Sequence, residues 1–163
     1  MTDRPFDIVS PEAIRSGQAT DAYFERTEST LRAADRNPHV VAEVTADQFP
    51  DGEFELLAGL KDAAALLADR PIDVDAIPPG RLFDGGPVLR IEGPYLEFAR
   101  LETSLLGLLS HASGIATAAL EARQAAPDSS VLSFGARHVH PSIAGVVERS
   151  ALIGGVDGFS HVA

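Results

Sequence analysis

Two residues of opposite charge follow apolar runs near the end of the chain, and such residues bind small polar ligands. Arg137 follows the run Val131–Phe134, and Asp157 stands in the glycine-rich run Gly154–Gly158. The runs predict two strands joined by a helix of small residues. In parallel α/β folds, ligands bind at the carboxyl ends of the strands. We therefore expect both strands to end at one sheet edge, one offering a cation and the other an anion.

The elements that must position these residues follow from periodicity, caps and turn signals. The patterns predict helices over 11–17, 20–33, 53–67 and 96–126, a strand over 40–45, a turn over 49–52, and small strands joined by tight turns over 72–94. The centre of the longest helix, Ser110–Thr117, consists of small residues and includes Gly114. Because glycine inside a helix costs roughly 1 kcal/mol relative to alanine, we expect another backbone or a ligand to approach there.

These elements predict an α/β fold in two parts. Residues 1–126 form an N-terminal mixed α/β domain, sandwich-like, which includes the long helix 96–126. Residues 127–163 supply the first β-α-β elements of an incomplete C-terminal α/β barrel, truncated at residue 163.

The composition of the chain excludes some classes of function. The chain has 163 residues, 45% of them hydrophobic, no cysteine, and a net charge of −11 with a single lysine, Lys61. An acidic, arginine-over-lysine surface fits either a salt-loving host or a GC-rich genome. The absence of a basic stripe disfavours nucleic-acid binding. The lack of a signal pattern and of a long uninterrupted apolar run predicts a cytoplasmic protein with no membrane partner.

Four segments carry a resemblance to a known family. They are Gly17–Phe24 with its Thr-Asp-x-Tyr, Pro79–Gly93 followed by Glu102, Ser113–Thr117, and Ser133–Arg137 together with Gly154–Gly158. In this order they resemble the N-terminal part of the type II phosphoribosyltransferases, most closely the nicotinate phosphoribosyltransferases of archaea.

The resemblance implies a reaction of NAD salvage. Nicotinate and 5-phosphoribosyl 1-pyrophosphate give nicotinate mononucleotide and pyrophosphate, with Mg²⁺ on the pyrophosphate and with coupled ATP hydrolysis. It also implies a homodimer or higher oligomer with shared sites. The later phosphate loops of the barrel, and the histidine that ATP phosphorylates, are absent from these 163 residues. We therefore expect a fragment or one piece of a split enzyme, which need not be active alone.

The resemblance also implies roles for five residues. Tyr23 would reach into a neighbouring subunit's site and stack on the pyridine ring, with Phe134 on the opposite face. Arg137 would lie near the ring substituent and the phosphoribosyl group, and Asp157 would be the acidic residue of the second barrel strand. Both are candidate catalytic residues. His111 occupies the position of a carboxylate-binding arginine in quinolinate phosphoribosyltransferases.

Each role has an ordinary structural alternative. Tyr23 and Phe134 would be core residues, and His111 a helix histidine with a local partner. Arg137 would pair at the surface with Glu148, and Asp157 would serve only as a turn residue before Gly158.

The sequence leaves two alternative functions and one candidate metal site to consider. The sister enzyme that decarboxylates quinolinate needs more cations, for example Arg-Lys where this chain has Arg137-His138. A non-catalytic remnant would associate with a partner through an open strand edge. His138 and His140, with His161 beyond them, lack a reliably placed carboxylate or third ligand, so we expect no transition-metal site.

Overall fold

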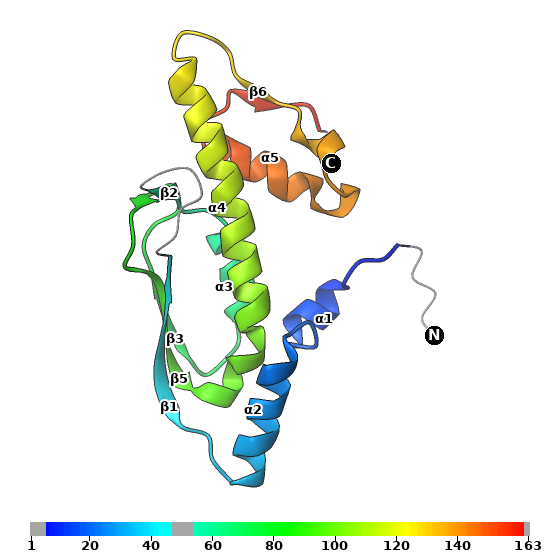
Figure 1. Cartoon of the computed structure of the whole chain (residues 1–163), viewed down its shortest axis with the longest axis vertical. Helices are drawn as coiled ribbons and strands as arrows, with labels where there is room; N and C mark the ends of the chain where they lie inside the picture. The colour runs from blue at the N-terminus through cyan, green and yellow to red at the C-terminus, as the bar shows by residue number, and fades with distance from the viewer. Residues whose placement is uncertain (1–5, 47–53, 162–163) are drawn as a thin grey trace.

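The computed structural model describes residues 6–46 and 54–161, which form a mixed α/β fold built along one long helix (Figure 1). The helices are α1 (Pro11–Arg15), α2 (Ala22–Ala33), α3 (Leu60–Leu67), α4 (Glu102–Ala125) and α5 (Ala144–Ile153), with short 3₁₀ turns η1 (Tyr95–Glu97), η2 (Ala99–Leu101), η3 (Gly135–His138) and η4 (Pro141–Ile143). The strands are β1 (His39–Thr45), β2 (Glu55–Leu56), β3 (Asp73–Ala76), β4 (Leu82–Phe83), β5 (Pro87–Pro94), β6 (Leu132–Ser133) and β7 (Gly158–Phe159).

The N-terminal part is an antiparallel sheet packed against helices. Its strand order is β1-β5-β3, with Ala42 opposite Ile91 and Ile91 opposite Val74. Along β1, half-buried and exposed residues alternate, because one face of the strand meets the core and the other meets solvent. The core between this sheet and helices α3 and α4 includes Leu57, Leu66, Leu89, Ile91, Phe98, Leu101, Leu105 and Leu109. The predicted mixed α/β fold is confirmed.

Helix α4 is the central element of both parts. Its small residues let the segment after β2 approach closely, and side chains complete the contact. The backbone N–H of Ala58 donates to Ser113 Oγ (3.0 Å), and that of Leu56 donates to Thr117 Oγ1 (2.8 Å). The predicted close approach is therefore found at Ser113 and Thr117, but not at Gly114, whose Cβ position has no described atom within 4 Å. By length and composition alone, the stretch Tyr95–Ala125 would also be long and apolar enough to cross a membrane, but these contacts are those of a domain core helix.

One predicted helix is wrong in its first half. Residues 55–56 form strand β2, which pairs with β4, and helix α3 begins only at Leu60. The boundary lies at Gly59, whose φ of +85° interrupts any helix that would run through it. Pairing with β4 and hydrogen bonds to α4 outweigh the helical spacing of the isolated segment. The predicted turn over 49–52 and residue Glu53 lie outside the described residues.

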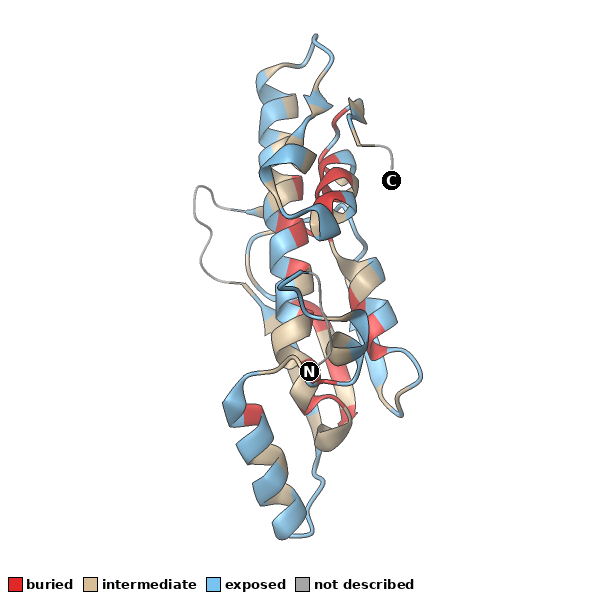
Figure 2. Cartoon of the chain, turned by 90° about the vertical axis from the view of Figure 1, so that its right-hand side faces the viewer, coloured by how far each residue is buried: buried red, intermediate tan, exposed pale blue. Residues whose placement is uncertain are grey.

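The other predicted elements are confirmed with shifted ends. The Ser10 side chain caps α1, α2 spans the expected residues, and three short strands occupy 72–94. Helix α4 begins six residues later than predicted, because Phe98, with φ −134°, separates two 3₁₀ turns before it. Figure 2 shows that buried residues concentrate along the middle of the molecule, whereas α2 buries only Phe24 and is otherwise exposed or intermediate.

Candidate functional site

The β-α-β unit at the end of the chain forms the predicted parallel strand pair. Strand β6 pairs with β7 through Leu132 opposite Gly158 and Ser133 opposite Phe159, and the Ser160 N–H donates to the Ser133 carbonyl (3.0 Å). Helix α5 connects the two strands and packs on α4. The carboxyl edge of this pair thus carries the residues after Ser133 and after Phe159.

Phe134 and Arg137 lie together at that edge. The guanidinium carbon of Arg137 is 5.8 Å from the centroid of the Phe134 ring, within the range of a cation–π contact. The Phe134 side chain is 51% exposed, so the alternative that it fills the core is wrong. An exposed aromatic face beside an exposed guanidinium is suited to a planar anionic ligand, which can stack on one and pair with the other.

The predicted position of Asp157 is wrong. Strand β7 begins at Gly158, so Asp157 precedes the strand and lies at the amino edge, opposite the edge that carries Arg137. Its Oδ2 accepts hydrogen bonds from Arg123 Nη1 (2.9 Å) and from the Val131 N–H (2.8 Å). The reason is that Gly154 and Gly155 turn the chain after α5, which delays the strand until after Asp157. Ser160 and His161 follow the strand and lie at the carboxyl edge instead, a position that the sequence pattern does not predict for them.

The surface ion pair considered for Arg137 does not form. Glu148 is 2% exposed, and neither of its carboxylate oxygens has a hydrogen-bond partner among the described residues. Arg137 is exposed at the end of η3. Its guanidinium is therefore free to meet a ligand rather than held by that carboxylate.

Tyr23 belongs to a second group, where α2 meets the start of α4. Thr103 Oγ1 donates to Asp21 Oδ2 (2.9 Å) and accepts from the Asp21 N–H (3.1 Å), which fixes the first turn of α2 on α4. Phe24 takes the core position, and the Tyr23 ring lies 4.2 Å from it and is 55% exposed. The alternative that Tyr23 is a core residue is wrong, and its ring is available to a ligand.

The two groups lie at opposite ends of α4 (Figure 1). Asp21 is bonded to Thr103 in the first turn, and Asp157 to Arg123 in the last. Twenty residues separate these anchor points, which at 1.5 Å per residue is about 30 Å along the helix. Tyr23 and the β6–β7 unit of one chain are therefore too far apart to hold the same small ligand.

His111 lies between the two groups, exposed on α4, and makes no hydrogen bond or ion pair with any described residue. A locally satisfied helix histidine is therefore not observed. Within the described ranges, no three His, Asp or Glu side chains are grouped so as to hold a metal ion. His140 instead contacts Ser142, with 2.7 Å between Nδ1 and Oγ.

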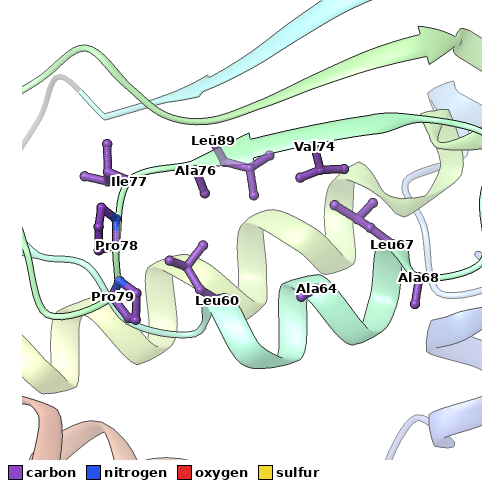
Figure 3. A pocket seen from close by; sticks show the side chains of 10 residues that line it. All are labelled: Leu60, Ala64, Leu67, Ala68, Val74, Ala76, Ile77, Pro78, Pro79 and Leu89. Carbon is purple, nitrogen blue, oxygen red and sulfur yellow. The ribbon is translucent and has the colours of Figure 1, made fainter.

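A pocket lies between α3 and β3 (Figure 3). It shares no lining residue with either group. Its volume is about 440 Å³, and its walls are apolar side chains that include Leu60, Val74, Pro79 and Leu89. None of these side chains can donate a proton, hold a charge or bind a phosphate. The pocket is therefore not a candidate catalytic site.

Glu102, at the start of α4 near Asp21, makes the stability of the fold depend on pH. Burial raises the pKa of Glu102, and the negative charge of Asp21 raises it further. Because the pKa is higher in the folded state, this carboxyl favours folding when the pH is below the pKa of glutamate in the unfolded chain, about 4.3. That contribution is lost as the pH rises through the folded value. We expect Glu102→Gln to raise the melting temperature at neutral pH, with no difference from the wild type at about pH 3.5.

Thermal unfolding across this pH range tests the expectation. Glu25→Gln, at an exposed position of α2, is the matched control for loss of one negative charge and should change little. A melting temperature of Glu102→Gln that stays at or below the wild-type value at every pH would contradict the expected sign.

The comparisons with known proteins agree with this fold. Residues 21–113 match the family model of the quinolinate phosphoribosyl transferase N-terminal domain. The chain superposes on a nicotinate-nucleotide pyrophosphorylase from Pyrococcus furiosus with a TM-score of 0.94 and 45% identity, over 98% of this chain and 41% of that one. A human nicotinic acid phosphoribosyltransferase gives a TM-score of 0.79 and 28% identity, over 87% and 36% of the two chains.

The chain therefore belongs to the quinolinate phosphoribosyltransferase N-terminal domain family. Curated relatives include a nicotinate phosphoribosyltransferase from Mycobacterium tuberculosis, 34% identical over 121 residues. The alignment covers 71% of this chain and 27% of that protein. For the bovine nicotinate phosphoribosyltransferase the identity is 40% over 94 residues, which is 18% of its length. The chain thus spans less than a third of the length of these two curated relatives.

Proposed function

We propose that this chain supplies part of a nicotinate phosphoribosyltransferase, which joins nicotinate to 5-phosphoribosyl 1-pyrophosphate and releases pyrophosphate in NAD salvage. The observation that carries the proposal is the exposed Phe134 ring beside the Arg137 guanidinium at the carboxyl edge of β6–β7. The names of the curated relatives support the same substrate.

In the proposed site, Phe134 stacks on one face of the pyridine ring and Arg137 pairs with the carboxylate or with the phosphoribosyl group. The ring nitrogen attacks C1 of the sugar as pyrophosphate leaves, through a transition state with oxocarbenium character. Holding the nitrogen in line with C1 is then the main task of these two side chains. Asp157 is not assigned to this step, because it lies at the opposite edge.

Mg²⁺ and ATP remain part of the proposal as companions of the substrates. The described residues offer no three-carboxylate or histidine cluster for a resident metal, and Asp157 already accepts from Arg123 and Val131. Mg²⁺ would therefore be bound through the pyrophosphate of the substrate, where it neutralises the leaving group.

The separation of Tyr23 from Phe134 along α4 supports a site shared between subunits. In a homodimer or higher oligomer, Tyr23 of one copy would complete the ring stack in the site of another, and His111 would be a further candidate contact. A cytoplasmic location fits such a metabolic enzyme.

The sister reaction on quinolinate is the second candidate, because the matched family model carries that name. A substrate with two carboxylates calls for more cations than one arginine. Here Arg137 is followed by His138, and this scarcity of cations favours nicotinate. A non-catalytic remnant that only associates is the third candidate, and it fits the exposed apolar residues Leu132, Leu152 and Phe159.

The test is formation of nicotinate mononucleotide from nicotinate, phosphoribosyl pyrophosphate, Mg²⁺ and ATP in molar salt. The 163-residue chain is assayed alone and within the longest open reading frame that contains it. We expect Arg137→Ala to lower kcat/KM about 10- to 100-fold, because it removes a charge-assisted hydrogen bond. Arg137→Lys should recover only part of this, since lysine cannot pair bidentately.

The control is Arg81→Ala, an exposed arginine outside both groups, which should leave kcat/KM unchanged. Turnover of quinolinate with release of CO₂, and none of nicotinate, would assign the chain to the sister enzyme. No turnover of either substrate in any form would favour the remnant.

A further inference from the structure

Asp157 joins three segments at the edge of β6–β7 that faces away from Phe134 and Arg137. Its Oδ2 accepts from Arg123 Nη1 (2.9 Å) and from the Val131 N–H (2.8 Å), and its own N–H donates to the Val131 carbonyl (2.8 Å). Arg123 also donates through Nη2 to the carbonyl of Ala126. The last turn of α4, the connection into β6 and the start of β7 therefore meet at one carboxylate.

The strands themselves provide little to fix their register. The ladder consists of two residue pairs, Leu132 with Gly158 and Ser133 with Phe159. Such a short pair of strands is marginal by itself, and a slip of one residue turns every side chain to the opposite face. The two hydrogen bonds between Val131 and Asp157 extend the pairing by one residue at its amino end. They therefore fix the alignment that places Phe134 at the other end.

Both residues of the Arg123–Asp157 ion pair belong to elements that are fixed in the fold. The Arg123 side chain is 21% exposed and belongs to α4, whereas the Asp157 side chain is 50% exposed. An exposed ion pair alone is worth little. The backbone hydrogen bond to Val131 adds a charge-assisted contact with fixed geometry, so the carboxylate is tied to a rigid helix and a strand at once.

We propose that Arg123 and Asp157 form a clamp that sets the register of β6 and β7 and thereby positions Phe134 and Arg137. Asp157 is then a positioning residue that acts through β6 and does not touch the substrate. The clamp itself is independent of the reaction. Only its effect on ligand binding rests on the proposed function.

Amide hydrogen exchange on the 163-residue chain tests the clamp directly. The reporter is the Ser160 N–H, which bonds to Ser133 across the two strands, and the reference is the Ala58 N–H, which bonds to Ser113. We expect Asp157→Asn and Arg123→Met each to speed exchange at Ser160 about tenfold or more relative to Ala58. In the double variant, exchange at Ser160 should be no faster than in the single variant with the faster exchange, because the two residues act as one unit.

Glu28→Gln is the matched control. It removes a carboxylate on α2 that pairs with Arg32 of the same helix and with Arg100 of η2, and exchange at Ser160 should not change. Equal exchange at Ser160 in the wild type and in all clamp variants would overturn the proposal.

A second measurement separates positioning from catalysis. In whichever form turns over nicotinate, Asp157→Asn should raise KM for nicotinate more than it lowers kcat, and Asp157→Ala should do so more strongly, because alanine cannot accept from Val131. A large loss of kcat in Asp157→Asn, with Ser160 exchange unchanged, would make Asp157 a catalytic residue and refute the clamp. If nicotinate is no substrate, the exchange result still decides on the clamp, so the two failures are distinguishable.

Discussion

Alanine at Gly59 is expected to lower the free energy of unfolding by about 2–5 kcal/mol. Two costs add here. The residue has φ of +85°, which an L side chain rarely adopts. A Cβ would also overlap the Leu108 carbonyl oxygen and lie 3.1 Å from its carbon and 3.2 Å from Ala112 Cβ. These atoms belong to α4, whose backbone cannot yield without moving the core.

Urea unfolding of Gly59→Ala beside Gly114→Ala measures this effect. Gly114 lies within α4 at an exposed position, and no described atom lies within 4 Å of the place where its Cβ would be. Its replacement should stabilise the chain by roughly 0.5–1 kcal/mol, the helix propensity of alanine over glycine. If both variants had the same midpoint, the close packing of residue 59 on α4 would be disproved.

Alanine at Gly154 is expected to separate the β6–α5–β7 unit from α4 at a cost of about 2–4 kcal/mol. Gly154 ends α5 with an ordinary right-handed backbone, so the cost is purely one of space. A Cβ there would overlap the Ala116 carbonyl oxygen and lie 2.6 Å from Ala119 Cβ and 3.0 Å from Leu120 N. Helix α5 would have to move outward, and β7 with it.

Exchange mapped along the chain should show faster exchange in α5 and at Ser160, and little change in the sheet β1-β5-β3. If the proposed function and the proposed clamp hold, nicotinate binding should weaken in parallel, because the clamp makes the position of Phe134 depend on β7. Gly145→Ala is the matched control on the same helix, since no described atom lies within 4 Å of its Cβ position. Protection of α5 that survives in Gly154→Ala would show that the helix does not need this contact.

Much of the fold was predictable because local signals and burial agree. Ser10 and Pro11 specify the start of α1, and the alternation along β1 specifies a half-buried strand. The turn residues over 72–94 indicated small strands, and the small residues around Ser113 indicated a close approach. The division of the chain at residues 126 and 127 stays a prediction, since α4 packs on elements of both parts.

The prediction failed where distant contacts overrule local pattern. Residues 55–58 have helical spacing, but β4 and α4 offer hydrogen bonds that only an extended segment can make. The glycines before Asp157 predict a strand end, whereas in the structure they turn the chain ahead of a strand. Neither the extended segment 55–58 nor the late start of β7 is indicated by the residues within a ten-residue window.

The sequence by itself determined the class of fold and the family, and it named Phe134 and Arg137 as candidate site residues, because residue types and spacing are local properties. Only the tertiary structure decided which side chains share a site. It set Asp157 against Arg123 and Val131, and it placed Tyr23 near the other end of α4. The physical reason is that strand register and helix packing are fixed by hydrogen bonds between residues far apart in the chain, which no local pattern specifies.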